Sequence, residues 1–285
     1  MTTAKADRVT SVRHFRELHK GAVLILPNAW DAASAAIIEA AGARAIATTS
    51  AGISWAIGTH DAHGLNRHQM AAAVARIVQA VSVPVSADIE GGYGDEPRDV
   101  AETVRAIIDA GAIGINLEDS PGQDDQPLQS ATAQVRRIAA ARVAAEGSGV
   151  DLFINARTDV FLMAVGDPET RVQNVHERLR AYAAAGADGF FVPGLIDLDV
   201  IRELASGPLP LNVMAGPRAP SVAALARAGA SRISIGSAIA QAAYQLVARS
   251  ANELLTIGTY DCLVESIDYD AINDLMSKHR GQLET

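Results

Sequence analysis

"AGAIGINLEDS", residues 110–120, carries the signals of a helix that ends and a buried strand that follows it. Gly111 comes after an alanine-rich run, and glycine is the residue that most often ends a helix in the left-handed conformation. The apolar run from 113 to 117 then has the composition of a buried parallel strand. The tripeptide Ala-Gly-Ala stands at the same kind of junction four times, at residues 41–43, 110–112, 185–187 and 228–230. The repeat therefore predicts a chain of alternating helices and strands.

Eight such units can be placed along the 285 residues. We expect strands at residues 23–29, 45–50, 83–89, 113–118, 152–158, 189–193, 210–215 and 232–236. We expect helices after them at residues 31–41, 67–80, 97–110, 130–146, 168–185, 197–205, 220–228 and 237–250. Residues 7–20 are predicted as an N-terminal capping helix.

This count favours an α/β fold of the (β/α)8 TIM-barrel type. A doubly wound open sheet is the alternative, but "LILPNAWDA" (24–32) lacks the Gly-x-Gly-x-x-Gly that follows the first strand of that fold. No break in composition divides the chain. We therefore expect one barrel domain over 1–285, with 238–285 as a C-terminal helical oligomerisation segment.

Composition argues against several classes of function. The net charge of −9 and the lack of a basic run argue against a nucleic-acid partner. No apolar run reaches the roughly 18 residues of a membrane helix, and no signal-peptide core is present. Cys262 is the single cysteine, which fits a reducing cytoplasm. Lysine occurs only at Lys5, Lys20 and Lys278, near the ends of the chain, which argues against Schiff-base and pyridoxal chemistry.

Carboxylates gather at the predicted C-terminal ends of neighbouring strands. Asp88 and Glu90 are two residues apart and so share a strand face, and Glu118 ends the next strand. Any one of these acids could be a simple helix cap, but three that point into one barrel repel each other unless a cation neutralises them. Arg157 supplies only one positive charge. We therefore expect a divalent cation held by oxygen ligands, Mg²⁺ or Mn²⁺, with Asp61 as a further acid that reaches the metal through water.

Four segments carry a family resemblance: "GTHDAHGL", "VPVSADIEGGYG", "GINLED" and "FINARTDVFL". In this order and spacing they resemble the isocitrate lyase/phosphoenolpyruvate mutase superfamily, over about residues 20–240. The resemblance implies a barrel whose eighth helix is exchanged between the subunits of a homodimer or homotetramer. It also implies Mg²⁺ held by the carboxylates at Asp61, Asp88, Glu90 and Glu118.

The same resemblance assigns substrate contacts. The arginine that matches Arg157 holds the substrate carboxylate in that family, and the backbone of the "TTSAG" segment contacts the substrate's oxygens. The predicted substrate-binding residues are Thr49, Ser50, Ala51, Gly52, Asp88, Arg157 and Asn212, with a small carboxylate as the ligand.

The sequence departs from the family pattern at two places, both in the part of the site that selects the reaction. Isocitrate and methylisocitrate lyases carry a catalytic cysteine in the loop after the fourth strand, and phosphonomutases carry lysine and asparagine there. Here that loop is "SPGQDDQPLQS" (120–130), without any of the three. A histidine used after the sixth strand in phosphonopyruvate chemistry is replaced by Pro193 in "FFVPG".

The leading hypothesis is a Mg²⁺-dependent lyase that cleaves a C–C bond of a small α-keto or α-hydroxy carboxylate through an enolate. Decarboxylation requires least from the altered loop, whereas retro-aldol cleavage needs a base, for which Tyr93 or Asp61 would serve. Asp61, Tyr93 and Arg157 are thus the predicted catalytic residues. The alternatives are P–C bond chemistry, as a mutase or hydrolase, and a barrel that binds a metabolite without turnover.

Overall fold

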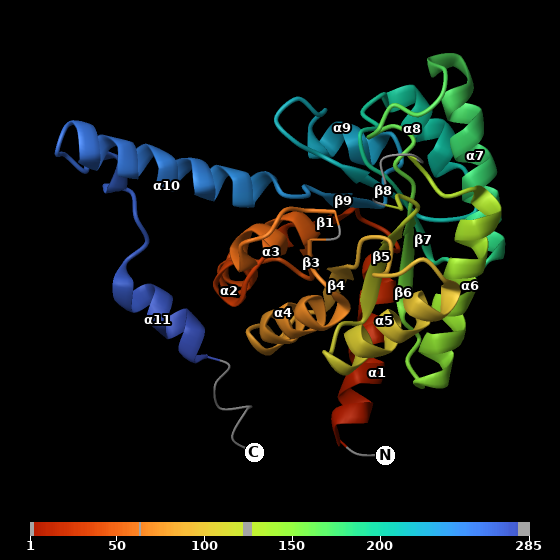
Figure 1. Ribbon diagram of the computed structural model, residues 1–285, viewed down its shortest axis with the longest axis horizontal. Coiled ribbons are helices and arrows are strands. Elements are labelled where there is room, and N and C mark those ends of the chain that lie inside the picture. Colours follow the sequence, from red (N-terminus) through yellow and green to blue (C-terminus); the bar gives the residue numbers. More distant parts are fainter. Residues whose placement is uncertain (1–2, 63, 122–126, 279–285) are drawn as a thin grey trace.

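The strands form a barrel of parallel strands surrounded by helices, in a computed structural model that describes residues 3–62, 64–121 and 127–278 (Figure 1). The strands are β1 (Leu24–Leu26), β2 (Asn28–Ala29), β3 (Ile46–Thr48), β4 (Val85–Asp88), β5 (Gly114–Glu118), β6 (Phe153–Arg157), β7 (Gly189–Val192), β8 (Leu211–Met214) and β9 (Arg232–Ser234). Every pairing is parallel, in the order β1-β9-β8-β7-β6-β5-β4-β3-β2. The predicted TIM-type barrel is confirmed.

The barrel closes through its first strand, which Pro27 divides into β1 and β2. Proline has no N–H to donate, so the ladder is interrupted at that residue. β1 pairs with β9 and β2 pairs with β3, so this one run joins both ends of the sheet. The Asn28 side chain reinforces the junction: its Oδ1 accepts from Ile235 N at 2.9 Å, and its Nδ2 donates to Thr48 O at 2.9 Å.

The helices follow the strands as the repeat predicts. They are α1 (Thr3–Leu18), α2 (Ala32–Ala40), α3 (Ser50–Ile57), α4 (Arg67–Gln79), α5 (Pro97–Asp109), α6 (Ala131–Gly147), α7 (Pro168–Ala184), α8 (Leu198–Ala205), α9 (Val222–Arg227), α10 (Ala238–Thr256) and α11 (Tyr269–Ser277). The capping helix α1 begins before the expected residue 7, and α10 continues beyond the expected residue 250. The other predicted helices agree to within about two residues at each end.

Helix α3 is a correction, because residues 45–50 were expected to be a strand throughout. The strand ends at Thr48, Thr49 is the N-cap with extended backbone (φ −124°, ψ 119°), and Ser50 begins the helix. Gly52 lets α3 pack closely, since a Cβ at that position would lie 2.7 Å from Trp30 Cβ. Thr48 and Thr49 keep the extended backbone that their β-propensity favours, and the helix begins only at the next residue.

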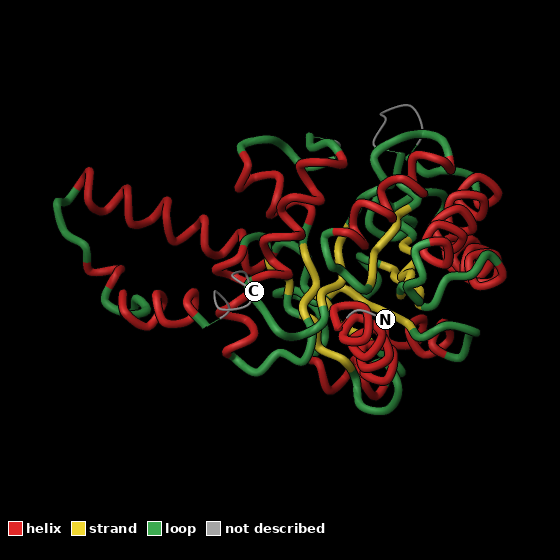
Figure 2. The backbone as a smooth tube through the Cα atoms, turned by 90° about the horizontal axis from the view of Figure 1, so that it is seen from below, coloured by secondary structure: helices red, strands yellow, loops and turns green. Residues whose placement is uncertain are grey.

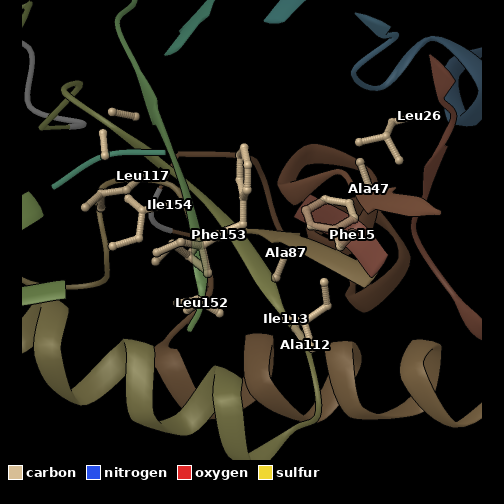
Figure 3. Close-up of a cluster of buried hydrophobic side chains, with 14 of the residues drawn as sticks. Phe15, Leu26, Ala47, Ala87, Ala112, Ile113, Leu117, Leu152, Phe153 and Ile154 are labelled. Atoms are coloured by element: carbon tan, nitrogen blue, oxygen red, sulfur yellow. The ribbon is translucent and has the colours of Figure 1, made fainter. Parts of the chain in front are cut away.

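Helix α1 closes the N-terminal end of the barrel. Phe15 is fully buried, and its ring packs edge-to-face against Phe153 of β6, with ring centroids 5.4 Å apart. His19 stacks on the same Phe153 ring at 4.1 Å. Figure 3 shows Phe15 and Phe153 among strand side chains that include Leu26, Ala47 and Ala87, and Figure 2 shows α1 at one end of the ring of strands. The opposite end is therefore the open one.

Helix α10 extends away from the barrel (Figure 1), and the chain then turns back so that α11 packs against α2. Ala240 is the one buried residue of α10. Large apolar side chains are exposed along the α10–α11 segment, among them Tyr244, Leu246, Val247, Leu254, Leu255, Tyr260 and Val264. Residues 279–285 of the predicted oligomerisation segment lie outside the described residues. Within the ranges that are described, no helix is long and apolar enough to cross a membrane.

Candidate active site

Asp88, the last residue of β4, lies at the open end of the barrel and is buried, with 8% of its surface exposed. Its Oδ2 accepts a hydrogen bond from Ser50 Oγ at 3.2 Å, and its N–H donates to Thr48 Oγ1 at 2.9 Å. Among the described residues, Asp88 Oδ1 is buried with no hydrogen-bond partner. Burial raises the pKa of Asp88, Arg157 opposes this, and the charge of Asp61 adds to it. A buried carboxylate oxygen without a donor is a costly arrangement that a bound cation would relieve.

Glu90 lies in the same region as Asp88, although it does not continue the strand as the sequence predicted. The strand ends at Asp88, and Glu90 adopts the left-handed conformation with φ 50°, so strand alternation does not place it. Tyr93 is also left-handed, with φ 56°, and its hydroxyl donates to Glu90 Oε1 at 3.2 Å. Two non-glycine residues in this costly region within four positions mark a strained turn, and such strain concentrates at functional sites.

The turn after β4 is anchored from outside. The Arg137 guanidinium of α6 donates to the carbonyls of Gly91, Gly94 and Asp95, the last two at 3.1 and 2.8 Å. The glycines therefore belong to a turn that Arg137 fixes through three hydrogen bonds.

Arg157, at the end of β6, lies in the centre of the carboxylate group. Its Nη1 is 2.7 Å from Glu118 Oε2 and 3.9 Å from Asp88 Oδ2. Its Nε and Nη2 bind both oxygens of Asp159, at 2.6 and 2.9 Å. Although burial lowers the pKa of Arg157, the carboxylates of Glu118, Asp159 and Asp88 raise it well above its usual value, so it stays charged. The bidentate clamp by Asp159 fixes the guanidinium plane.

Glu118 is held against Arg157 in a dry environment. Burial raises the pKa of Glu118 well above its usual value, and Asp159, Asp88 and Glu90 add to this rise against the opposing effect of Arg157. These contributions also show that the carboxylates of β4, β5 and β6 lie within each other's field. The predicted gathering of Asp88, Glu90 and Glu118 is therefore present in the structure.

Asp159 is itself supported by a second buried group. Its N–H donates to Asp119 Oδ1 at 3.0 Å, and its Oδ2 accepts from Ser120 Oγ at 2.7 Å. Asp119 Oδ2 accepts from Arg178 Nη1 and from the Tyr182 hydroxyl of α7, both at 2.8 Å. These hydrogen bonds of Asp119 tie the rim of the barrel to α7.

Polar side chains continue down the interior of the barrel. Asn155 Nδ2 donates to Asn116 Oδ1 at 2.9 Å and to Asn212 Oδ1 at 3.0 Å, and Arg232 Nη2 donates to Asn116 Oδ1 at 3.2 Å. Asn212 is 1% exposed, and its Nδ2 donates to the Val213 and Arg232 carbonyls and to Ser234 Oγ. Asn212 thus takes part in an internal network, and its contact with substrate stays a prediction.

The remaining predicted residues lie beyond the end of β3, at the start of α3 and in the connection that follows it. Thr49, Ser50, Ala51 and Gly52 are buried at the N-terminus of α3, and Ser50 contacts Asp88 directly. Asp61 is exposed in the connection between α3 and α4, yet its charge reaches Asp88. Part of the reaction-selecting loop 120–130 (residues 122–126) lies outside the described residues.

The carboxylate oxygens of this site suit a hard divalent cation, although the side chains do not lie close enough together to bind one ion at the same time. No three Asp, Glu, His or Cys side chains within the described ranges form a ready metal cluster. Arg157 instead occupies the space between Glu118 and Asp88. Carboxylate oxygens are the ligands that Mg²⁺ and Mn²⁺ prefer, and the unpartnered Asp88 Oδ1 provides one. The residues present therefore fit such an ion.

Sequence reasoning did not identify the supports of this site. Asp159, the Asp119–Arg178–Tyr182 group and Arg232 were not among the predicted site residues. Asp159 and Arg232 each stand two positions from an inward-facing residue, Arg157 and Ser234, and that spacing was the available signal. The bonds to Arg178 and Tyr182 join residues 59 and 63 positions apart, which no local pattern shows.

Comparison with known proteins supplies an independent finding. The family model for phosphoenolpyruvate phosphomutase matches residues 15–255. An uncharacterised protein of Mycobacterium tuberculosis is 37% identical over 226 residues, 78% of this chain and 81% of that one. The 2-methylisocitrate lyase of Aeropyrum pernix is 32% identical over 197 residues, 67% of this chain and 60% of that enzyme.

A solved structure extends the likeness over nearly the whole chain. A Burkholderia cenocepacia J2315 protein, provisionally assigned as a lyase/mutase, superimposes with a TM-score of 0.88 at 36% identity. The match covers 95% of this chain and 97% of that protein. The likeness therefore includes the strands and loops that carry the carboxylates and Arg157.

Proposed function

Since this chain belongs to the phosphoenolpyruvate phosphomutase family, we propose that it is a Mg²⁺-dependent lyase that cleaves a C–C bond of a small α-keto or α-hydroxy carboxylate. Members of this family are lyases or mutases. The carboxylate site supports the assignment of this chain as a lyase. The observation that carries the proposal is the buried, unpartnered Asp88 Oδ1 beside Arg157, Glu90 and Glu118. A metal bound there would supply positive charge to the oxygen of a forming enolate.

The residues around this centre would divide the remaining tasks. Asp88, Glu90 and Glu118 would hold the metal, with Asp61 above them. Arg157 Nη1 lies against Glu118 and faces Asp88. This nitrogen would bind the substrate carboxylate. The backbone of residues 49–52, at the N-terminus of α3, would offer N–H groups to substrate oxygens.

Tyr93 favours decarboxylation over retro-aldol cleavage. Burial raises the pKa of Tyr93 well above its usual value, and the charge of Glu90 adds to the rise. Its hydroxyl therefore keeps its proton at neutral pH and is unsuited to act as the base that retro-aldol cleavage needs. Decarboxylation leaves an enolate that needs a proton and requires no base.

The direct test is turnover of oxaloacetate, methylisocitrate, dimethylmalate and phosphonopyruvate, each with Mg²⁺ and with a chelator. We expect oxaloacetate to give pyruvate and carbon dioxide, and the chelator to stop the reaction. Turnover of phosphonopyruvate alone would favour the P–C alternative. Binding of these compounds without any turnover would favour a metabolite-binding barrel.

We also propose a homodimer or homotetramer in which α10 packs on another copy of the chain. Val247 and Leu255 are 64% and 84% exposed, with further apolar side chains beside them. Large exposed apolar side chains gathered on one helix are typical of an interface. A cytoplasmic location stays a prediction from the single cysteine.

The wild-type protein is expected to sediment as a dimer or larger species at micromolar concentration. Val247→Glu should shift it towards the monomer, because a charge would be buried at the interface. Gln245→Glu adds the same charge to an exposed position of the same helix and removes no apolar surface, so it should keep the wild-type size. A monomeric wild type would overturn the proposed assembly.

A further inference from the structure

Arg232 is a buried positive charge that the proposed reaction does not use. It begins β9, faces the barrel interior and is 1% exposed. Its Nη2 donates to Asn116 Oδ1 at 3.2 Å, while its Nε and Nη1 have no hydrogen-bond partner among the described residues. Buried arginines are normally paired with a carboxylate, because an isolated charge is expensive to remove from water. A guanidinium held in this way calls for an explanation.

The field of Arg232 extends along the barrel axis in both directions. Burial lowers the pKa of Arg232 to about 9, and Asp88 at the rim opposes that effect. Towards the closed end, Arg232 contributes to the lowering of the His19 pKa to about 3, where burial is the largest cause. Arg232 therefore lies between the α1 floor and the carboxylates and interacts with both through space.

A count of formal charges shows how Arg232 changes the net charge of the barrel interior. When all four are ionised, Asp88, Glu90, Glu118 and Asp159 carry four negative charges, of which Arg157 alone offsets one. With Arg232 included, the excess falls to two negative charges, which is the charge that one divalent cation supplies. The interior would then be neutral with the metal bound, before an anionic substrate arrives.

We propose that Arg232 is an electrostatic positioning residue, which weakens metal binding and strengthens the binding of the anionic substrate from below without touching either. This inference rests on the proposed function. Its physical basis is Coulomb's law in a water-poor interior, where a fixed charge acts over several ångströms. Arg232 repels a divalent cation and attracts a carboxylate or an enolate held beside that cation. A charge fixed in advance also needs no rearrangement when negative charge develops in the reaction.

The test is Arg232→Met, which removes the charge and keeps a long side chain. The network should survive this change, because Asn155 Nδ2 still donates to Asn116 Oδ1 at 2.9 Å. Calorimetry with Mg²⁺ alone should give about tenfold tighter binding than wild type. Calorimetry with oxalate, a planar mimic of the enolate, at saturating Mg²⁺ should give about tenfold weaker binding. A purely structural arginine would not move the two affinities in opposite directions.

Two controls isolate the charge. Arg232→Lys keeps a cation and should leave both affinities within about twofold of wild type. Arg202→Met removes the same charge from the surface of α8, where the side chain is 62% exposed, and should change neither. Equal Mg²⁺ and oxalate affinities in Arg232→Met and wild type would overturn the role of Arg232 and leave the proposed function standing. A wild-type protein that binds neither ligand would overturn both.

Discussion

Replacement of Asp88 by alanine is expected to weaken Mg²⁺ binding by at least about a hundredfold, or roughly 2.7 kcal/mol. The change removes Oδ1, the unpartnered buried oxygen at the centre of the carboxylate group. It also leaves Arg157 paired with Glu118, which keeps that acid away from the cation. Titration calorimetry at about pH 8 measures the loss directly.

The same variant should not destabilise the metal-free protein. Because the folded-state pKa of Asp88 is raised, the folded chain binds more protons than the unfolded chain as pH rises from the ordinary carboxylate range to that raised value. Asp88 therefore costs stability at higher pH, and its removal should keep or raise the Tm without metal. The rise of Tm on Mg²⁺ addition should disappear.

A matched control is Ser50→Ala, which removes the hydroxyl that donates to Asp88 Oδ2 and leaves the carboxylate in place. It should weaken Mg²⁺ binding by less than about tenfold. Equal metal affinity in Asp88→Ala and wild type would refute the assignment of Asp88 as a ligand.

Arg157→Lys is expected to weaken oxalate binding at saturating Mg²⁺ by about thirtyfold, or roughly 2 kcal/mol, which is within the range for charged hydrogen bonds. Arg157 uses Nε and Nη2 on Asp159 and presents Nη1 to the centre. A lysine ammonium cannot bind Asp159 with two parallel bonds and also direct a third donor to the substrate. Calorimetry with oxalate and a thermal melt should be run on the same sample.

The melt distinguishes two roles for Arg157. The bidentate pair with Asp159 is also what a purely structural arginine would make, so some loss of Tm is expected. Asp159→Asn is the comparison, because it loosens the clamp and keeps the guanidinium. It should lower Tm and weaken oxalate binding less than Arg157→Lys does. A lower Tm for Arg157→Lys with unchanged oxalate affinity would return Arg157 to a structural role.

The barrel itself was predictable because its signals are local. Each of the four Ala-Gly-Ala tripeptides ends one helix and precedes one strand, so the alternation of helices and strands follows from neighbours in the chain. Helix α3 was missed because the extended backbone of Thr48 and Thr49 was expected to continue through Ser50, whereas the turn into a helix at Ser50 depends on Gly52 fitting against Trp30. That contact becomes visible only once the chain is folded.

The site was predictable in its charges and not in its supports. Strand alternation placed Asp88, Glu118 and Arg157 at one rim, and it reached the right region for Glu90 although the strand had already ended. The bonds of Asp119 to Arg178 and Tyr182, and that of Arg232 to Asn116, depend on which distant parts of the chain come within bonding distance. Composition gives no measure of that distance.

The closure at Pro27 and Asn28 also has a consequence for how the chain folds. Asn28 binds the backbone of Ile235, 207 residues later, so the ring cannot close until the ninth strand is available. Contacts between such distant parts of a chain slow folding. During synthesis, β2 and β3 can pair early. The edge of β1 stays unpaired until β9, near the end of the chain, has been synthesised. Asn28 thus acts at the last stage of assembly, and its loss would appear first in a faster unfolding rate, because contacts that form late contribute little to the folding transition state.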